Sequence, residues 1–195
     1  MLPPMRIAVV GAGAMGAAAA RLLARHDDVD LVILDADAAR ADRVVEGVGR
    51  GHAAAAPIGS EELPKAIAGS DAVVACIPYR LNLEAMEAAL AAGVPYADLG
   101  GLFHMTRRQL ELDGRFREAG LAAVAGVGCC PGISNVLARM AADRLESVRS
   151  IDIIDGAIEE DERFGVPYSA DTILDEFTMP AMVFEEGSFR QVGDL

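Results

Sequence analysis

Residues 6–16 read "RIAVVGAGAMG", an apolar run followed by three glycines in the pattern G-x-G-x-x-G. The unbroken apolar run is typical of a strand that is buried on both faces of a parallel sheet. The alanine-rich residues 14–25 that follow have the pattern of a helix. A glycine loop between a buried strand and a helix is the arrangement that binds a dinucleotide, so this stretch predicts a Rossmann-type fold.

Each glycine of the loop has its own predicted role. Gly11 permits the tight turn, Gly13 lets the backbone approach a pyrophosphate, and Gly16 allows the helix to pack closely on the strand. The N–H groups at the start of the helix favour negative charge. We therefore expect the cofactor to bind along the loop at Gly11, Ala12, Gly13, Ala14, Met15 and Gly16.

Asp35 ends the next predicted strand, residues 30–35, about 20 residues after the glycine loop, as the dinucleotide pattern requires. Its carboxylate can accept hydrogen bonds from the adenosine ribose and repels a 2′-phosphate. This favours NAD as the cofactor, although Arg40 nearby leaves NADP possible.

The rest of residues 1–146 alternates between strand and helix patterns. We expect strands at 6–10, 30–35, 52–58, 71–78, 95–101 and 121–128, and helices at 14–25, 38–48, 60–69, 82–93, 106–120 and 132–145. Ser60 and Thr106 are predicted N-caps. Six strands separated by helices and short loops predict an α/β fold with a doubly wound parallel sheet in the order 3-2-1-4-5-6.

This rhythm changes in residues 147–195. Residues 148–158 alternate like a strand, 159–171 are polar like a loop, 169–177 predict a helix capped by Ser169, and 181–192 predict a hairpin with its turn near Gly187. We expect a Rossmann domain at 1–146, followed at 147–195 by the start of a truncated α+β substrate domain.

Composition limits the classes of partner. The chain has 195 residues, 52% of them hydrophobic, and a net charge of −13. This charge argues against nucleic acid and mildly favours a cationic or zwitterionic small molecule. We expect no membrane segment and no secretory signal. The three cysteines lack disulfide spacing, so we expect a reducing cytoplasm.

Ligands of doubly wound sheets lie over the carboxyl ends of the strands. Tyr79 follows the fourth predicted strand, Asp98 lies near the end of the fifth, and His104 follows shortly after. We expect these three residues to be catalytic. The alternatives are a surface tyrosine, an aspartate that binds loop amides, and a solvated loop histidine. Cys129 and Cys130 are interpreted as packing residues, and no metal site is predicted.

The later motifs have a family resemblance. The segments "VVGAGAMG", "ACIPY", "PYADLGG" and "GVGCCPGISNVLA" occur in the order typical of the saccharopine dehydrogenase-like family. Together with "EFTMPAMVFEEG", they make the chain most similar to the lysine 6-dehydrogenases of that family. Cys130 departs from the family pattern, in which an acidic residue often precedes Pro-Gly. Members also continue well past the position of Leu195, so we expect the substrate domain to be incomplete.

The resemblance implies an NAD(P)-dependent dehydrogenase that acts on a C–N bond of an amino acid. It implies that Ile77, Pro78 and Tyr79 flank the nicotinamide half of the cofactor and that Gly132 also contacts it. It further implies a set that faces the substrate: Asp98, Gly100, Gly101 and His104.

Oxidation of the lysine ε-amine is the preferred activity. It requires a general base, for which His104 and Asp98 are candidates, and an arginine for the substrate carboxylate, for which Arg80, Arg107 and Arg163 are candidates. The first alternative is a saccharopine or carboxynorspermidine dehydrogenase or reductase. The second is a non-catalytic NAD-binding module or an inactive fragment. Because exposed strand edges favour pairing, we expect a homodimer or a homotetramer.

Overall fold

The computed structural model describes residues 3–154, 156 and 169–192 of the chain. The chain divides into two compact units, residues 1–133 and 134–195. The division comes before most of helix α7 (Ile133–Ala142), whereas the sequence places the end of the first domain at residue 146. The functional boundary between the two domains stays a prediction.

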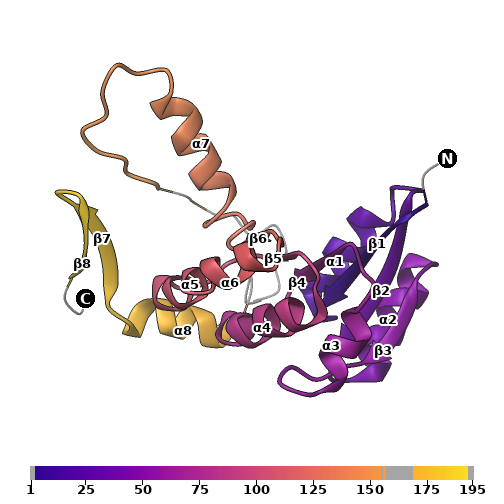
Figure 1. The fold of residues 1–195 in the computed structure, drawn as a ribbon. Helices are drawn as coiled ribbons and strands as arrows, with labels where there is room; N and C mark the ends of the chain where they lie inside the picture. The colour runs from indigo at the N-terminus through magenta and orange to yellow at the C-terminus, as the bar shows by residue number, and fades with distance from the viewer. Residues whose placement is uncertain (1–2, 155, 157–168, 193–195) are drawn as a thin grey trace, which may run out of the picture. The chain divides into compact units, whose positions relative to one another are not determined.

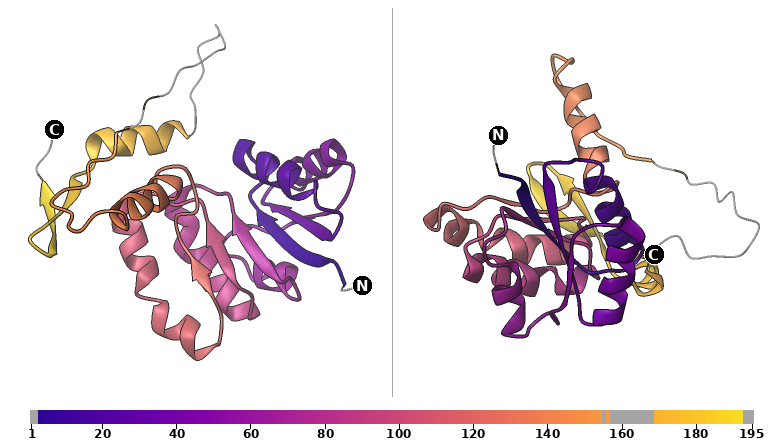
Figure 2. Two further views of the ribbon diagram at one scale, coloured as in Figure 1. Left: turned by 90° about the horizontal axis from the view of Figure 1, so that it is seen from above. Right: turned by 90° about the vertical axis from the view of Figure 1, so that its right-hand side faces the viewer.

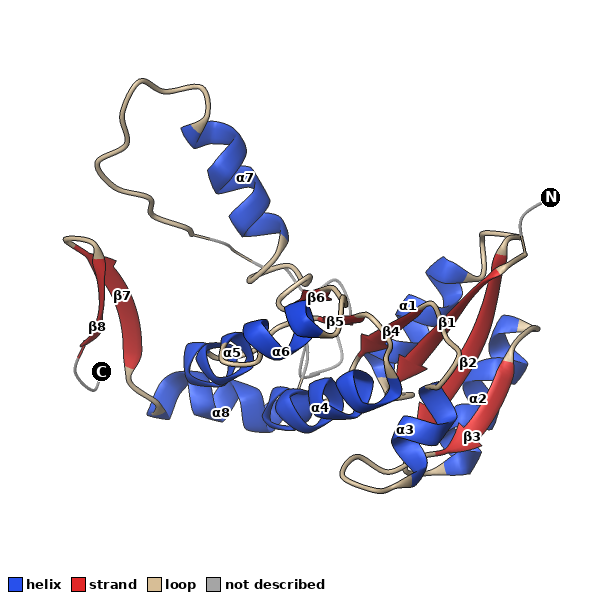
Figure 3. Cartoon of the chain, in the orientation of Figure 1, coloured by secondary structure: helices blue, strands red, loops and turns tan. Residues whose placement is uncertain are grey.

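The first unit contains a six-stranded parallel sheet in the order β3-β2-β1-β4-β5-β6, which confirms the predicted doubly wound order. Figures 1 and 3 show these strands with the helices that connect them. The strands are β1 (Met5–Val10), β2 (Val29–Asp35), β3 (His52–Ala55), β4 (Ala72–Ala75), β5 (Tyr96–Asp98) and β6 (Ala123–Val124). The helices are α1 (Ala14–Leu23), α2 (Ala38–Val48), α3 (Glu62–Ile67), the 3-10 turn η1 (Tyr79–Leu81), α4 (Asn82–Ala92), α5 (Phe103–Leu110) and α6 (Asp113–Glu118).

Alternate residues of the central strands point to opposite faces of the sheet and build two separate cores. Ile7 and Leu31 pack on one face with Ala20 of α1 and Ala41 of α2. Their neighbours in the strands pack on the other face with residues of α3, α4 and α6, among them Ala8, Val32, Leu63, Ile67, Ala85, Met86 and Phe116. Because both faces are covered, the strands need the continuous apolar runs seen in the sequence. Figure 2 shows this sheet from two further sides.

Three local predictions in this unit are wrong. The helix expected at 106–120 is two helices, and α5 begins at Phe103, so Thr106 lies inside it and is no cap. Helix α3 has Glu61 at its N-cap with no side-chain capping bond, and the Ser60 hydroxyl donates to the carbonyl of Pro57 at 2.7 Å. The sixth strand pairs only at Ala123 and Val124. Residues 125–127 that follow it are irregular, and Gly128 makes an isolated bridge with Gly132. Glycine weakens a strand because it has no side chain to pack.

The second unit contains most of α7, helix α8 (Ala170–Thr178) and a hairpin of β7 (Ala181–Glu185) and β8 (Ser188–Val192). The hairpin is confirmed, with Glu186 and Gly187 both at positive φ as a type I′ turn requires. The Ser169 hydroxyl caps α8 as expected. The strand expected at 148–158 is wrong for residues 148–154, which are irregular and pair with no strand among the described residues. Residues 155 and 157–168 lie outside the described part.

Candidate active site at the carboxyl ends of the strands

Strand β1 leads directly into the glycine loop, which the fold holds at the carboxyl end of the sheet. Gly11 has a φ of 98°, and a β-carbon there would lie 2.9 Å from Cγ2 of Ile77. A β-carbon on Gly16 would overlap the carbonyl group of Gly11. Both glycines are therefore required by the packing of the loop itself.

Gly13 differs from these two glycines because a β-carbon on it would meet no atom within 4 Å. It is the N-cap of α1, which has no side-chain capping bond and no acidic residue in its first turn. The positive end of α1 therefore faces an open space that side chains of its own first turn do not neutralise. These features fit the pyrophosphate of a dinucleotide, which approaches the backbone at such a position.

Asp35 lies beside the glycine loop, at the end of β2. Its carboxylate accepts hydrogen bonds from the backbone N–H of Ala12 at 2.8 Å and of Asp37 at 3.0 Å. Arg40 also approaches it, with 3.7 Å between Nη1 and Oδ1. Asp35 thus supports the glycine loop, and the exposed Arg40 is a cation that pairs with its carboxylate.

The end of β4 lies against the glycine loop, since the Cys76 N–H donates to the carbonyl of Val10 at 2.7 Å. Ile77 packs on Gly11, so the structure brings it together with the predicted cofactor loop, and Pro78 follows as the N-cap of η1. Burial raises the pKa of the Cys76 thiol to about 11. Cys76 therefore stays a neutral packing group at neutral pH.

Tyr79 and His104 meet although they come from different elements. Tyr79 begins η1 and is buried, and the exposed His104 lies on the first turn of α5. Their rings form an edge-to-face pair with centroids 5.7 Å apart. Arg80 lies over the Tyr79 ring, with Cζ 5.8 Å from its centroid, and its Nε donates to the Tyr79 hydroxyl at 3.4 Å. The phenol ring of Tyr79, the imidazole of His104 and the guanidinium of Arg80 thus lie together at one end of the sheet.

Asp98 is fully buried at the end of β5, with 0% of its surface exposed. Its Oδ1 accepts from the backbone N–H of Gly100 at 2.7 Å and of Gly126 at 2.8 Å, and its Oδ2 accepts from Nε2 of Gln109 at 2.6 Å. These are the contacts of the alternative interpretation, in which Asp98 binds loop amides. The geometry offers no exposed carboxylate oxygen for proton transfer to a substrate.

Gly132 belongs to the glycine-rich loop 126–132 between β6 and α7. A β-carbon on it would overlap the backbone of Gly128, and the Pro131 ring packs against Gly100. The loop therefore lies on residues 99–101 at the carboxyl end of β5. Cys129 and Cys130 are exposed free thiols in this loop, so the expectation that they are packing residues is wrong. The close packing here is provided by the glycines and Pro131.

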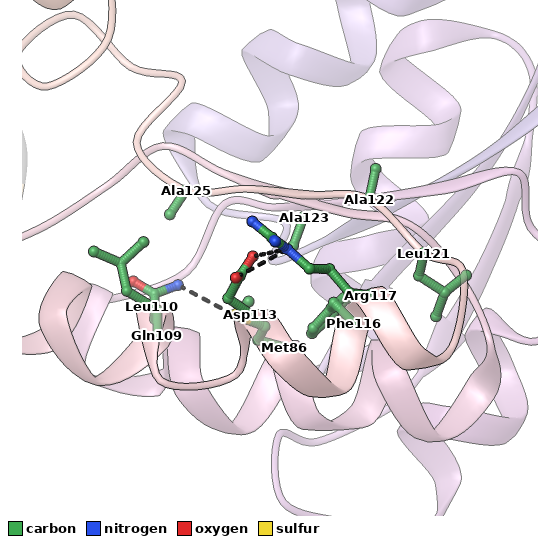
Figure 4. Close-up of a pocket in the computed structure, with 10 residues that line it drawn as sticks. All are labelled: Met86, Gln109, Leu110, Asp113, Phe116, Arg117, Leu121, Ala122, Ala123 and Ala125. Atoms are coloured by element: carbon green, nitrogen blue, oxygen red, sulfur yellow. Dashed lines mark hydrogen bonds and ion pairs between the residues drawn. The ribbon is translucent and has the colours of Figure 1, made fainter.

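A pocket of about 260 Å³ lies elsewhere in this unit, beside α5, α6 and β6 (Figure 4). Its lining is largely apolar, and an ion pair between Asp113 and Arg117, 3.0 Å apart, borders it. The lining residues are Met86, Gln109, Leu110, Asp113, Phe116, Arg117, Leu121, Ala122, Ala123 and Ala125. This set does not contain any of the predicted site residues.

Sequence reasoning missed two buried polar residues near the site. Asn82 donates through Nδ2 to the carbonyl of Gly100 at 3.3 Å, and Gln109 holds Asp98. Gln109 had a detectable signal, because it falls between Met105 and Leu112 on the apolar side of its helical segment. Asn82 had none, since a polar residue at the start of a helix is ordinary.

The described residues contain no group of three or more His, Cys, Asp or Glu side chains that could hold a metal ion. Within the same residues, every helix is too short or too polar to cross a membrane.

The parallel sheet order, the glycine loop and the acid that ends β2 define a Rossmann domain of the NAD(P)-binding class. Residues 7–124 match the family model described as the saccharopine dehydrogenase NADP binding domain. The chain belongs to this family, whose members include NAD(P)-dependent dehydrogenases, as the resemblance of its motifs implied.

Individual relatives are distant. The chain is 23% identical to the carboxyaminopropylagmatine dehydrogenase of Synechocystis, over 97% of this chain and 51% of that protein. It is also 23% identical to the carboxynorspermidine synthase of Vibrio alginolyticus, over 96% of this chain and 52% of that protein. The chain thus spans about half the length of these curated relatives.

Among solved structures, apo saccharopine dehydrogenase (L-Glu forming) from Saccharomyces cerevisiae superposes with a TM-score of 0.74 at 18% identity, over 96% of this chain and 44% of that one. GenD2 from gentamicin A biosynthesis, solved in complex with NAD, superposes with a TM-score of 0.54 at 24% identity, over 74% of this chain and 40% of that one. Both similarities show the fold.

Proposed function

We propose that the protein exchanges a hydride between NAD(P) and the carbon of a C–N bond in an amine that also carries a carboxylate. The observation that supports this most is the placement of the Tyr79, Arg80 and His104 cluster. It lies at the carboxyl end of the same sheet that carries the glycine loop, in a chain of the saccharopine dehydrogenase family. Ligands of such sheets bind at that end.

Each member of the cluster has a distinct proposed role. His104 is exposed, and it takes the proton that an ammonium group must lose before a hydride can leave the neighbouring carbon. Tyr79 is fixed between Gly101 and His104 and orients the substrate. Arg80 presents a planar guanidinium for a substrate carboxylate. The nicotinamide, when bound, supplies the hydride acceptor or donor.

The cofactor set follows from the same geometry. The loop Gly11–Gly16 would hold the pyrophosphate, Asp35 the adenosine ribose, and Ile77 and Pro78 the nicotinamide half, with Gly132 on the adjoining loop. Asp35 supports NAD as the preferred cofactor. Its ion pair with Arg40 also leaves a place for the 2′-phosphate of NADP.

Two substrate classes fit this site. The first is the lysine ε-amine, which the motif order favours and which the net charge of −13 would attract as a cation. The second is a secondary amine formed by joining an aldehyde to an amine. The names of the Synechocystis and Vibrio alginolyticus relatives, which denote carboxylated polyamines, support this second class.

A substrate screen separates these classes. The full-length natural protein is incubated with NAD or NADP and with lysine or saccharopine, and in the reductive direction with carboxylated polyamine precursors, while reduced nicotinamide is followed by its absorbance. The proposal is supported if the wild-type protein turns over one of these amines and His104→Gln loses this turnover while it keeps its affinity for the cofactor. Tight cofactor binding without turnover of any amine would leave a binding module instead.

The remaining proposals concern the environment of the protein. We expect it to work in a reducing cytoplasm as a homodimer or homotetramer. The three thiols are free in the structure, which is compatible with a reducing compartment. Light scattering of the full-length protein measures the oligomeric state.

A further inference from the structure

Asp98 and Gln109 form a buried polar pair that joins three segments of the first unit. Gln109 is 1% exposed on α5, and its Nε2 donates to the fully buried Asp98 carboxylate of β5. The other carboxylate oxygen of Asp98 accepts from Gly100 and from Gly126, which lies 28 residues further along the chain. One side-chain pair therefore ties α5, the loop after β5 and the loop after β6.

Burial makes this pair costly unless every bond is made. A carboxylate removed from water loses several kcal/mol of solvation, which hydrogen bonds from the protein must replace. Gln109 donates to Oδ2, whereas the two backbone N–H groups donate to Oδ1. Nearby, burial and the Asp98 charge raise the pKa of the Tyr96 phenol, so that this neighbour stays neutral.

The rest of the Gln109 side chain has weak contacts. Its Oε1 is buried without a hydrogen-bond partner, and Nε2 has only Met86 Sδ, at 3.9 Å, as its other contact (Figure 4). The bond to Asp98 is therefore the strongest polar contact that this side chain makes.

Helix α5 carries both Gln109 and His104. The helix is thus attached to the sheet end twice, through Gln109 to Asp98 and through His104 to the Tyr79 ring. The loop that Asp98 binds also carries Gly101, where a β-carbon would lie 2.9 Å from Cδ2 of Tyr79. A shift of Asp98 would therefore displace both neighbours of Tyr79.

We propose that Gln109 is a positioning residue: through Asp98 it fixes α5 and the loops at 99–101 and 125–128, and so sets the placement of His104 against Tyr79. The expected loss of activity rests on the proposed function, whereas the placement of His104 against Tyr79 can be tested without any activity.

The test uses the full-length protein with three variants. Gln109→Leu removes the donor and keeps the size. Gln109→Glu keeps the shape and can donate to Asp98 only while the two carboxyl groups share a proton. Gln191→Glu makes the same chemical change on the exposed hairpin and is the matched control. Binding of ADP-ribose, which engages the glycine loop without the nicotinamide, tests whether the domain is intact.

We expect Gln109→Leu to lower kcat/KM by about 100-fold, as a small misplacement of catalytic groups does, with ADP-ribose affinity and the Gln191→Glu control unchanged. The activity of Gln109→Glu, relative to that of the wild-type protein at the same pH, should be highest at acidic pH and fall as pH rises and both carboxyl groups ionise. The imidazole NMR resonance of His104, assigned with His104→Gln, should move in Gln109→Leu because the ring current of Tyr79 on it changes.

An unmoved His104 resonance in a folded Gln109→Leu would overturn the inference, as would an equal loss of ADP-ribose binding. If Gln109→Leu does not fold, the difference between the His104 resonances of Gln109→Glu and the wild-type protein, measured at each pH, decides instead. A difference that does not change with pH refutes the positioning role. If the wild-type protein oxidises no amine but the resonance still moves, the proposed function fails and the positioning role stands.

Discussion

Replacing Gly13 and Gly16 separately by alanine should distinguish a ligand-binding glycine from a packing glycine in one loop. At Gly13 a β-carbon meets no atom within 4 Å, and the φ of −75° suits alanine. The fold should therefore lose no more than about 1 kcal/mol, the usual cost of alanine at an N-cap. The β-carbon would instead occupy the space of the pyrophosphate. Losing one charge-assisted hydrogen bond costs about 1.5–3 kcal/mol, which is roughly 10- to 150-fold in cofactor affinity.

At Gly16 the added β-carbon would overlap the carbonyl of Gly11, and the backbone of a buried loop has little room to move. Overpacking of this kind costs about 3 kcal/mol, which lowers Tm by roughly 6–12 °C in a domain of this size. Thermal unfolding and titration with NAD measure the two effects on the same samples. Gly13 is not a ligand-binding glycine if Gly13→Ala unfolds like Gly16→Ala, or if Gly13→Ala binds NAD as tightly as the wild-type protein.

Three further predictions concern the cofactor ribose, the thiols and the substrate. Asp35→Ala should shift the ratio of NAD to NADP affinity toward NADP by about tenfold or more, because the charge that repels a 2′-phosphate is removed; an unchanged ratio from fluorescence titration would contradict this. Since the pKa of the Cys76 thiol is raised to about 11 from 9.0, the unfolded chain ionises first. The contribution of this thiol to the free energy of unfolding is complete below pH 9 and is lost as pH rises toward 11. Mass spectrometry at pH 8 should find iodoacetamide on Cys129 and Cys130 before it appears on Cys76. Arg80→Lys should raise KM for a carboxylated substrate about tenfold with little change in kcat, because lysine lacks the bidentate fork; an equal loss in kcat would argue against this role.

The sequence was sufficient to predict the sheet because its signals there are local. The apolar runs at β1, β2 and β4 and the turn at Gly187 each depend on neighbours within a few residues. Helix boundaries were less predictable, since Ser60 and Thr106 have the chemistry of caps but their caps depend on where the chain turns. The sixth strand was overestimated because glycine-rich residues share its apolar composition.

Part of the candidate site could likewise be predicted from local sequence signals, and part of it could not. The glycine loop and Asp35 follow a spacing that can be read along the chain. The buried state of Asp98 could not be read, because its partners Gly126 and Gln109 become neighbours only when the ends of β5 and β6 and helix α5 come together. The edge-to-face contact between Tyr79 and His104 likewise depends on where α5 begins, which the sequence placed three residues too late, at Thr106 and not at Phe103.

Hydride exchange at a carbon bonded to nitrogen should carry an isotope from the amine to the cofactor. The full-length protein is given NAD(P) and lysine or saccharopine carrying deuterium on the carbon next to the reacting nitrogen, and the cofactor is analysed by mass spectrometry. We expect deuterium on the reduced nicotinamide in the wild-type protein and its loss in His104→Gln. Bound cofactor that gains no deuterium from any such amine would contradict the account.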